Sequence, residues 1–200
     1  MAEMKPKRDE APNTMKLSAI LLAAGSGSRF GGDKLLHRLA GGTPLGVAAA
    51  RNLLAVIPDV VAVVREGDLT LASLLAQEGC DVRRFADAAR GMGASLAHGV
   101  RARPASAGWL VALADMPAVP GSAISDVMRE LESGAVLAAP FHKNRRGHPV
   151  GFGKRFGPQL MALDGDAGAR DILAAHAAVI VRVACDDPGV LRDIDRRADL

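Results

Sequence analysis

The sequence predicts an α/β fold, a three-layer α/β/α sandwich with a mostly parallel, Rossmann-like sheet. Five short apolar runs of strand length alternate along the chain with segments that carry helical patterns. Strands that are separated by helices pair in parallel, and the helices then cover both faces of the sheet. A glycine-rich loop follows the first apolar run, at the edge of the sheet where ligands of such folds bind.

Each predicted strand is a run of apolar residues. The first run, at residues 17–23, is continuous and is followed by Gly25, as expected for a strand that is buried on both faces. The other four runs lie at residues 60–64, 109–114, 136–139 and 179–183. Together they predict the core of the sheet.

Caps and leucine spacing identify the helices. A helix over residues 44–54 would begin with Thr43 as its N-cap and Pro44 at its first position. A second helix, over 68–77, carries leucines at helical spacing. Three more are predicted at residues 94–103, 122–131 and 166–176. The basic segment 141–152 interrupts this alternation and is predicted to be a loop or hairpin beside the sheet edge.

The length and composition suit one globular domain. The chain has 200 residues, 49% of them hydrophobic and 24% charged. Residues 1–14 are polar and contain proline, and are predicted to form a disordered tail before a single domain at 15–200. Cys80 and Cys185 belong to no CxxC pair, so we expect buried free thiols in a reducing, cytoplasmic compartment.

The charge balance argues against two classes of partner. The chain has 25 Lys and Arg against 22 Asp and Glu, a net charge of +3, and contains five Phe, one Trp and no Tyr. This charge is too weak for an electrostatic nucleic-acid binder, and there are few aromatic rings to stack on bases. No apolar run approaches the length of a membrane span. The sequence therefore predicts neither a nucleic acid nor a membrane as a partner.

The loop at residues 24–34 is a candidate phosphate site. Its glycines let the backbone approach a ligand, and consecutive N–H groups can cradle phosphate oxygens. Arg29 and Lys34 add positive charge. The loop is not a P-loop, because Leu35 follows the lysine, and it is not a dinucleotide fingerprint, because Phe30 takes the place of the third glycine. A glycine turn with two solvated cations is the alternative.

Acidic residues provide candidate metal ligands. Asp115 follows the apolar run 109–114, at the edge of the sheet where ligands bind. Asp193 and Asp195 lie on one side of an extended segment. Mg²⁺ prefers one or two carboxylates together with substrate phosphates. A turn cap before Pro117 and a solvated acidic surface are the alternatives.

The string LAAGSGSRFGGDK at residues 22–34 resembles the signature of the MobA-like nucleotidyltransferases, which include the molybdenum cofactor guanylyl- and cytidylyltransferases. The resemblance covers most of the chain from Leu17 onward and implies a fold of the nucleotide-diphospho-sugar transferase type. It implies that the loop wraps a nucleoside triphosphate, and Ala24 is similar to the cytidylyl branch. The implied nucleotide-binding residues are Leu22, Ala23, Ala24, Gly25, Gly27, Arg29, Lys34, Asp87, Gly91 and Ser95.

The last three of these residues lie in a glycine turn that leads into a helix start, where free N–H groups can bind an anion. The segment resembles the GMSSSL motif of the cytidylyl branch, which implies a place near the nucleotide. Gly93 and Ala94 replace the first two serines, so their hydroxyl groups are missing. An ordinary helix-initiating serine is the alternative for Ser95.

Two strings resemble the metal-binding motifs of the family. LADMP at 113–117 resembles its Asp motif, and DIDRRADL at 193–200 resembles DIDTPEDL, from which it departs at 196–198. The resemblance implies Asp115 and Asp195 as ligands of Mg²⁺, with Asp193 in reserve. It further implies Arg29, Lys34 and Asp115 as the catalytic residues.

The basic segment contains RRGHPV, which resembles a family motif that borders the pterin pocket. This implies that the acceptor-binding residues are Arg145, Arg146, Gly147, His148 and Pro149. A solvated basic hairpin is the alternative. GDAGAR at 165–170 resembles the GDKGAR motif with Ala167 in place of the lysine, and Arg170 could lie near the acceptor or pair with Asp166.

The resemblance implies Mg²⁺-dependent cytidylyl transfer from CTP to the phosphate of molybdopterin or the molybdenum cofactor, with release of pyrophosphate. A molybdoenzyme would receive the product. Guanylyl or other nucleotidyl transfer to a small phosphate acceptor is one alternative, and a non-catalytic nucleotide- or pterin-binding chaperone is another. The absence of a GxSxG elbow argues against a serine hydrolase, and Phe30 argues against an NAD-dependent oxidoreductase.

Overall fold

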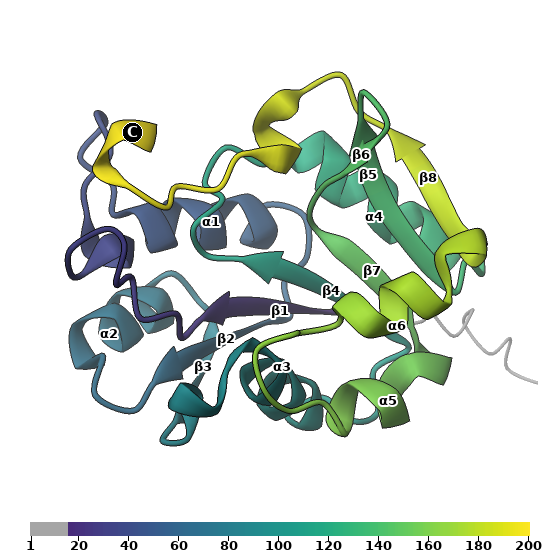
Figure 1. Cartoon of the computed structure of the whole chain (residues 1–200), viewed down its shortest axis with the longest axis horizontal. Helices are drawn as coiled ribbons and strands as arrows, with labels where there is room; N and C mark the ends of the chain where they lie inside the picture. The colour runs from purple at the N-terminus through teal and green to yellow at the C-terminus, as the bar shows by residue number, and fades with distance from the viewer. Residues whose placement is uncertain (1–15) are drawn as a thin grey trace, which may run out of the picture.

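The computed structural model describes residues 16–200, which form one mixed sheet of eight strands with helices on both faces (Figure 1). The predicted tail at 1–14 lies outside the described residues. The strand order is β3-β2-β1-β4-β7-β5-β6, and β8 pairs with β5. The predicted α/β/α sandwich is confirmed.

Parallel pairing dominates the sheet. The pairs β1–β2, β1–β4, β2–β3 and β5–β8 are parallel, whereas the pairs that involve β6 or β7 are antiparallel. The strands are β1 Ser18–Ala23, β2 Val60–Arg65, β3 Asp81–Phe85, β4 Gly108–Leu113, β5 Leu137–His142, β6 Arg145–Arg146, β7 Val150–Gly153 and β8 Ile180–Ala184.

The connections are helical. The α-helices are α1 Leu45–Leu54, α2 Leu69–Gln77, α3 Met92–Arg101, α4 Gly121–Glu132, α5 Gly157–Met161 and α6 Arg170–Ala175. The 3-10 turns are η1 Lys34–Leu36, η2 Ala88–Arg90, η3 Lys154–Phe156, η4 Ala177–Val179, η5 Pro188–Leu191 and η6 Arg197–Asp199. The first helix is capped by Pro44 rather than Thr43, and the last is shorter than predicted.

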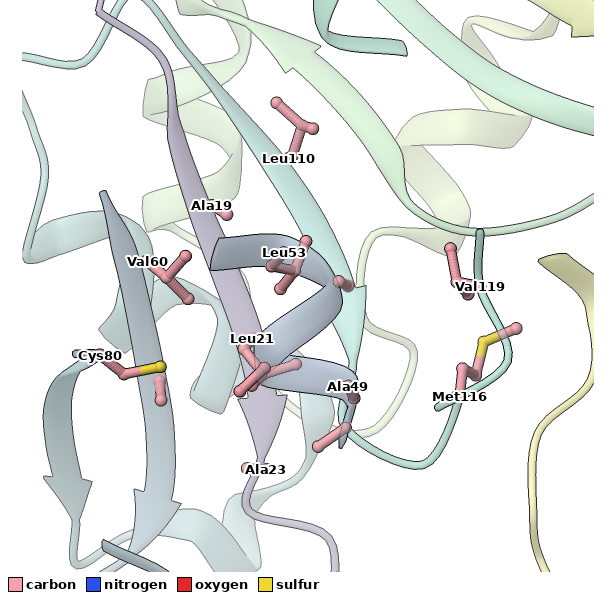
Figure 2. Close-up of a cluster of buried hydrophobic side chains, with 14 of the residues drawn as sticks. Ala19, Leu21, Ala23, Ala49, Leu53, Val60, Cys80, Leu110, Met116 and Val119 are labelled. Carbon is pink, nitrogen blue, oxygen red and sulfur yellow. The ribbon is translucent and has the colours of Figure 1, made fainter. Parts of the chain in front are cut away.

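Side chains of the central strands alternate between two cores, because successive residues of a strand face opposite ways. Ala19 and Leu21 of β1 pack with side chains of α1, α2 and α4. Ile20, which lies between them in the sequence, packs with side chains of α3, α5 and α6. Figure 2 shows the first core, with Leu53 of α1 close to the β1 side chains. This double burial explains the continuous apolar runs.

Two strands depart from the sequence prediction. β3 was not predicted, because its sequence DVRRF is polar and its side chains are largely accessible at the edge of the sheet. β7 was predicted as part of a loop or hairpin beside the sheet edge, but it lies inside the sheet between β4 and β5. Its short sequence VGFG lacks an apolar run, since Gly151 faces Val127 and Leu131 with no room for a side chain.

The two cysteines differ in burial. Both are free thiols, as predicted. Cys80 is buried among apolar side chains, and burial raises its pKa to about 11. Cys185 is partly exposed, so the prediction that both are buried is wrong for this residue.

Arg103 joins two carboxylates at the amino ends of the parallel strands, away from the ligand edge. It contacts Asp59 at 2.8 Å and Asp81 at 2.9 Å, and Ser18 donates to Asp59 at 2.7 Å. Burial acts to raise the pKa of Asp59, but the hydrogen bonds from Arg103 and Ser18 outweigh it and hold that pKa below its ordinary value. Burial and arginine hydrogen bonds act on Asp81 in the same way, with the same net direction.

We predict that Arg103→Met destabilises the fold by about 1–2 kcal/mol at pH 7, at the low end for charged hydrogen bonds because the pairs are partly exposed. A carboxyl with a lowered folded pKa stabilises the protein above its unfolded pKa of about 3.9, and this contribution is lost as the pH falls through the folded pKa. Urea unfolding should therefore show the deficit shrinking below about pH 4. Arg129→Met, at an exposed i,i+3 pair, is the control. A deficit that is constant between pH 7 and pH 3 would contradict the assignment.

Candidate active site

A cavity of about 610 Å³ opens at the carboxyl ends of β1 to β4. Its lining comes from the loop after β1, the end of β2, the segment after β3 and the residues that follow β4, joined by two residues from later in the chain. The lining residues are Leu22, Ala24, Gly25, Ser26, Gly27, Ser28, Arg29, Lys34, Leu35, Arg65, Ala88, Ala89, Gly91, Met92, Ser95, Leu113, Asp115, Asp166 and Asp195.

Phe30 anchors the glycine loop. Its ring is buried in the core and packs edge-on against His37. Its backbone N–H donates to the carbonyl of Gly27 at 2.9 Å, and Gly27 has a φ of +61°, in the region that favours glycine. Phe30, which replaces the third glycine of the dinucleotide fingerprint, therefore anchors the loop to the core.

Lys34 bridges the two carboxylates that were predicted to bind metal. Its Nζ lies 2.8 Å from Oδ2 of Asp115 and 3.4 Å from Oδ1 of Asp195. Arg29 donates to the other oxygen of Asp195 at 2.5 Å. The side chain of Lys34 is 11% exposed, so water screens this ion pair only partly. Residues from three distant parts of the chain thus meet in one ionic cluster, formed by Arg29, Lys34, Asp115 and Asp195.

The ionic cluster has the donor set for a divalent cation. Oδ1 of Asp115 is buried and has no hydrogen-bond partner among the described residues. Within residues 16–200 no group of three or more His, Cys, Asp or Glu side chains is placed to hold a metal. A metal at Asp115 and Asp195 would therefore take its other ligands from substrate or water, as Mg²⁺ does.

The C-terminal segment carries Asp195 to the cavity. After β8 the chain crosses back over the sheet and ends beside the loop that follows β1 (Figure 1). The N–H of Ile194 donates to the carbonyl of Asp115 at 2.9 Å, and the Ile194 side chain is buried in the first core. This hydrogen bond fixes the position of Asp195 relative to Asp115.

The turn after Asp195 is closed by a carboxylate. Oδ2 of Asp199 accepts from the N–H groups of Asp195 at 2.9 Å and Arg196 at 2.7 Å. The guanidinium of Arg197 lies 5.5 Å from the centre of the Phe30 ring. The departure from the family motif at 196–198 therefore leaves an ordered turn. Asp193 is exposed and does not line the cavity.

The start of α3 packs against the loop at residues 164–168. The N–H of Gly93 donates to the carbonyl of Gly165 at 2.7 Å, and Arg90 contacts Asp164 at 2.8 Å. A Cβ at Gly93 would lie 2.6 Å from the carbonyl oxygen of Asp164, which explains why serine is missing there. The N–H of Gly93 is therefore occupied and not free for an anion.

Ser95 lies in the first turn of α3, whose N-cap is Gly91, so it does not initiate the helix. It lines the cavity, and its hydroxyl donates to the carbonyl of Gly91 at 3.1 Å. Of the other predicted nucleotide-binding residues, Ala23 is buried in the first core, and Asp87 is exposed beside Arg90. Neither lines the cavity.

None of the five predicted acceptor-binding residues lines this cavity. Arg145 and Arg146 form β6 and are exposed, and their role toward the acceptor stays a prediction. His148 and Pro149 line a separate small crevice, and burial lowers the pKa of His148, which favours a neutral ring. Gly147 packs against the carbonyl of Val190, and a side chain there would overlap it.

Sequence reasoning missed two charged residues of the cavity. Arg65 ends β2 and is held by two hydrogen bonds to Asp68, at 2.9 and 3.0 Å. Arg65 could have been predicted as a cavity residue, because it is a charged residue at the end of a buried strand. Asp166 lines the cavity without pairing with Arg170 or with another described side chain. Its place depends on a loop contact that no local pattern indicates.

The MobA-like NTP transferase domain matches residues 19–179, most of the chain. The chain belongs to this family. A relative with a different name also aligns along most of its length. Nicotine blue oxidoreductase from Paenarthrobacter nicotinovorans is 28% identical over 187 residues, which cover 90% of this chain and 92% of the relative.

Solved structures show the same fold. Rv0371c from Mycobacterium tuberculosis aligns over 92% of this chain and 95% of its own, with 22% identity and a TM-score of 0.78, and it has also been solved in complex with manganese. Molybdopterin-guanine dinucleotide biosynthesis protein A from Archaeoglobus fulgidus aligns over 91% and 94%, with 19% identity and a TM-score of 0.65. Among the helices of residues 16–200, none is long and apolar enough to cross a membrane.

We predict that Gly147→Ala displaces the C-terminal segment, because its Cβ would overlap the carbonyl oxygen of Val190. Overpacking of this kind costs about 1–3 kcal/mol, measurable by urea unfolding. Gly41→Ala is the matched control, since nothing lies within 4 Å of its Cβ and its φ is ordinary. Equal stability of the two variants would show that the Val190 contact does not constrain this segment.

Proposed function

We propose that this protein transfers CMP from CTP to a phosphate monoester of the molybdopterin class and releases pyrophosphate. The observation that carries the proposal is the ionic cluster, in which two carboxylates and two cations meet beside a glycine loop at the ligand edge of the sheet. Membership of the MobA-like NTP transferase family supports nucleotidyl transfer. The choice of CTP rests on the resemblance at Ala24.

The reaction needs no side-chain nucleophile. An oxygen of the acceptor phosphate attacks the α-phosphorus of CTP, a new P–O bond forms, and the bond to the pyrophosphate oxygen breaks. The acceptor phosphate is already ionised near neutral pH, so no strong general base is required. Positioning and charge neutralisation then lower the barrier.

The cluster supplies both signs of charge for this reaction. Arg29 and Lys34 would bind the triphosphate and stabilise the charge that develops on pyrophosphate. Asp115 and Asp195 would hold Mg²⁺, which when bound supplies positive charge at the α-phosphate. The unpartnered Oδ1 of Asp115 supports this assignment. The manganese complex of Rv0371c supports a divalent ion in this fold.

The pterin acceptor is supported by the resemblance of the RRGHPV segment to a family motif and by the name of the Archaeoglobus fulgidus structure. The cytoplasm, where nucleotides and free thiols are kept, is the proposed location. A molybdoenzyme is the proposed recipient of the product.

A second candidate is an oxidoreductase, because one relative bears that name at 28% identity. The cavity would then hold a nicotinamide dinucleotide instead of a triphosphate, with a loop that departs from the dinucleotide fingerprint at Phe30. The two functions differ in their ligands and products, so one ligand screen separates them.

We predict that CTP with Mg²⁺ raises the melting temperature more than GTP, ATP, UTP or NADPH does, because a ligand that binds the native state stabilises it by mass action. Thermal shift measures this directly, and pyrophosphate release with a pterin phosphate acceptor confirms turnover. A preference for GTP would overturn the cytidylyl assignment. Stabilisation by NADPH without pyrophosphate release from any NTP would favour the oxidoreductase.

We predict that Asp115→Asn and Asp195→Asn each lower kcat by about a hundredfold or more, a typical loss for a group that stabilises charge in the transition state. Neither side chain is part of a hydrophobic core, so the melting temperature should stay close to that of the wild type. Asp193→Asn, an exposed carboxylate two residues away, is the matched control and should keep normal activity. Near-normal turnover of the Asp115 variant would exclude its proposed role.

A further inference from the structure

Asp166 is a carboxylate in the cavity that the ionic cluster does not use. It lines the cavity, and within residues 16–200 its side chain forms no hydrogen bond or ion pair. It is carried by the loop at 164–168, far along the chain from the glycine loop that supplies the cations. Asp166 is exposed at the edge of the cavity. A carboxylate repels phosphate, so a nucleotide bound in the cavity would place a part other than its phosphates beside Asp166.

The position of Asp166 is fixed by its neighbours. The carbonyl of Gly165 accepts the N–H of Gly93 at 2.7 Å, and Asp164 holds both the Arg90 guanidinium and the N–H of Gly165. A Cβ at Gly91 would overlap Oδ1 of Asp166, so the carboxylate occupies the space that a side chain at 91 would take. The loop therefore presents Asp166 at the start of α3.

The sheet order places this carboxylate at one end of the cavity. Asp115 follows β4 and the glycine loop follows β1, whereas the segment that contacts Asp166 follows β3. Three strand spacings separate β4 from β3, or roughly 14 Å. A nucleotide with its phosphates at the ionic cluster would extend its nucleoside toward β3. The cavity residues that follow β3 are small or apolar, namely Ala88, Ala89, Gly91 and Met92, and Gly91 lies against Asp166.

We propose that Asp166 accepts a hydrogen bond from the nucleoside of the bound nucleotide, from a ribose hydroxyl or a base amine, and so selects which nucleotide binds. The inference rests on the proposed function only in requiring that a nucleoside triphosphate binds in this cavity. A carboxylate suits this task because it only accepts hydrogen bonds when ionised, and hydrogen bonds to a charged group are stronger than neutral ones.

The experiment is isothermal titration of the wild type, Asp166→Ala and Asp166→Asn without acceptor. The ligands are the NTP that binds the wild type best, its 2′-deoxy and 3′-deoxy forms, and inorganic pyrophosphate. CTP and UTP are compared as well, because only cytosine carries the base amine. We expect the wild type to bind at least one analogue that lacks a donor about tenfold more weakly than its parent. Asp166→Ala should abolish that discrimination, and the analogue concerned identifies the donor.

Pyrophosphate has no nucleoside, so its affinity should not fall in either Asp166 variant. Asp186→Asn is the matched control, because it removes the same charge from an exposed residue outside the cavity. It should leave the discrimination intact. Asp166→Asn keeps an acceptor oxygen and should retain part of the discrimination, which a purely structural role of Asp166 would not produce.

Two results overturn the inference while leaving nucleotidyl transfer intact. In one, Asp166→Ala discriminates among the analogues as the wild type does. In the other, the Asp166 variants bind every nucleotide and pyrophosphate more tightly by one common factor, as expected if the carboxylate only repels phosphate. If the wild type binds no NTP at all, both this inference and the proposed function fail.

Discussion

The placement of Asp195 depends on contacts between backbones that leave no room for a side chain. Gly147 packs against the carbonyl of Val190, and Gly189 packs in the same way against the carbonyl of Ala118. These contacts hold the C-terminal segment against the loops that follow β4 and β6. The hydrogen bond from Ile194 to Asp115 then sets the spacing of the two carboxylates. The ionic cluster is thus positioned by the main chain, and its side chains complete it.

The fold could be predicted because double burial leaves a signal in the sequence. Strands β1, β2 and β4 are covered on both faces, so nearly every residue in them is apolar. Strands that are not buried on both faces by large apolar side chains were not predicted. β3 lies at an edge and is mostly polar, and β7 is short and contains two glycines that fit against α4 and the residues just before β5.

Much of the site could be predicted for a different reason. The glycine loop and Asp115 each lie directly after a strand, so their place at the ligand edge follows from the strand alone. Asp195 needed the resemblance, because its segment reaches the cavity by a long return across the sheet. Asp166 was not predicted to line the cavity, because its position depends on a contact between its loop and α3 that the sequence does not indicate. The role of the cations at 145 and 146 toward the acceptor stays a prediction, since no local pattern distinguishes a solvated hairpin from a pocket wall.

Lys34 has a consequence for how ligands combine. Its ammonium group lies between the two carboxylates, where it acts as a tethered cation. On the proposed function, a divalent ion that enters alone must compete with a positive charge that the chain itself supplies. A triphosphate that draws Lys34 and Arg29 toward its own oxygens removes this competitor. Metal and nucleotide would then bind with positive cooperativity, and linkage requires each to strengthen the other by the same factor.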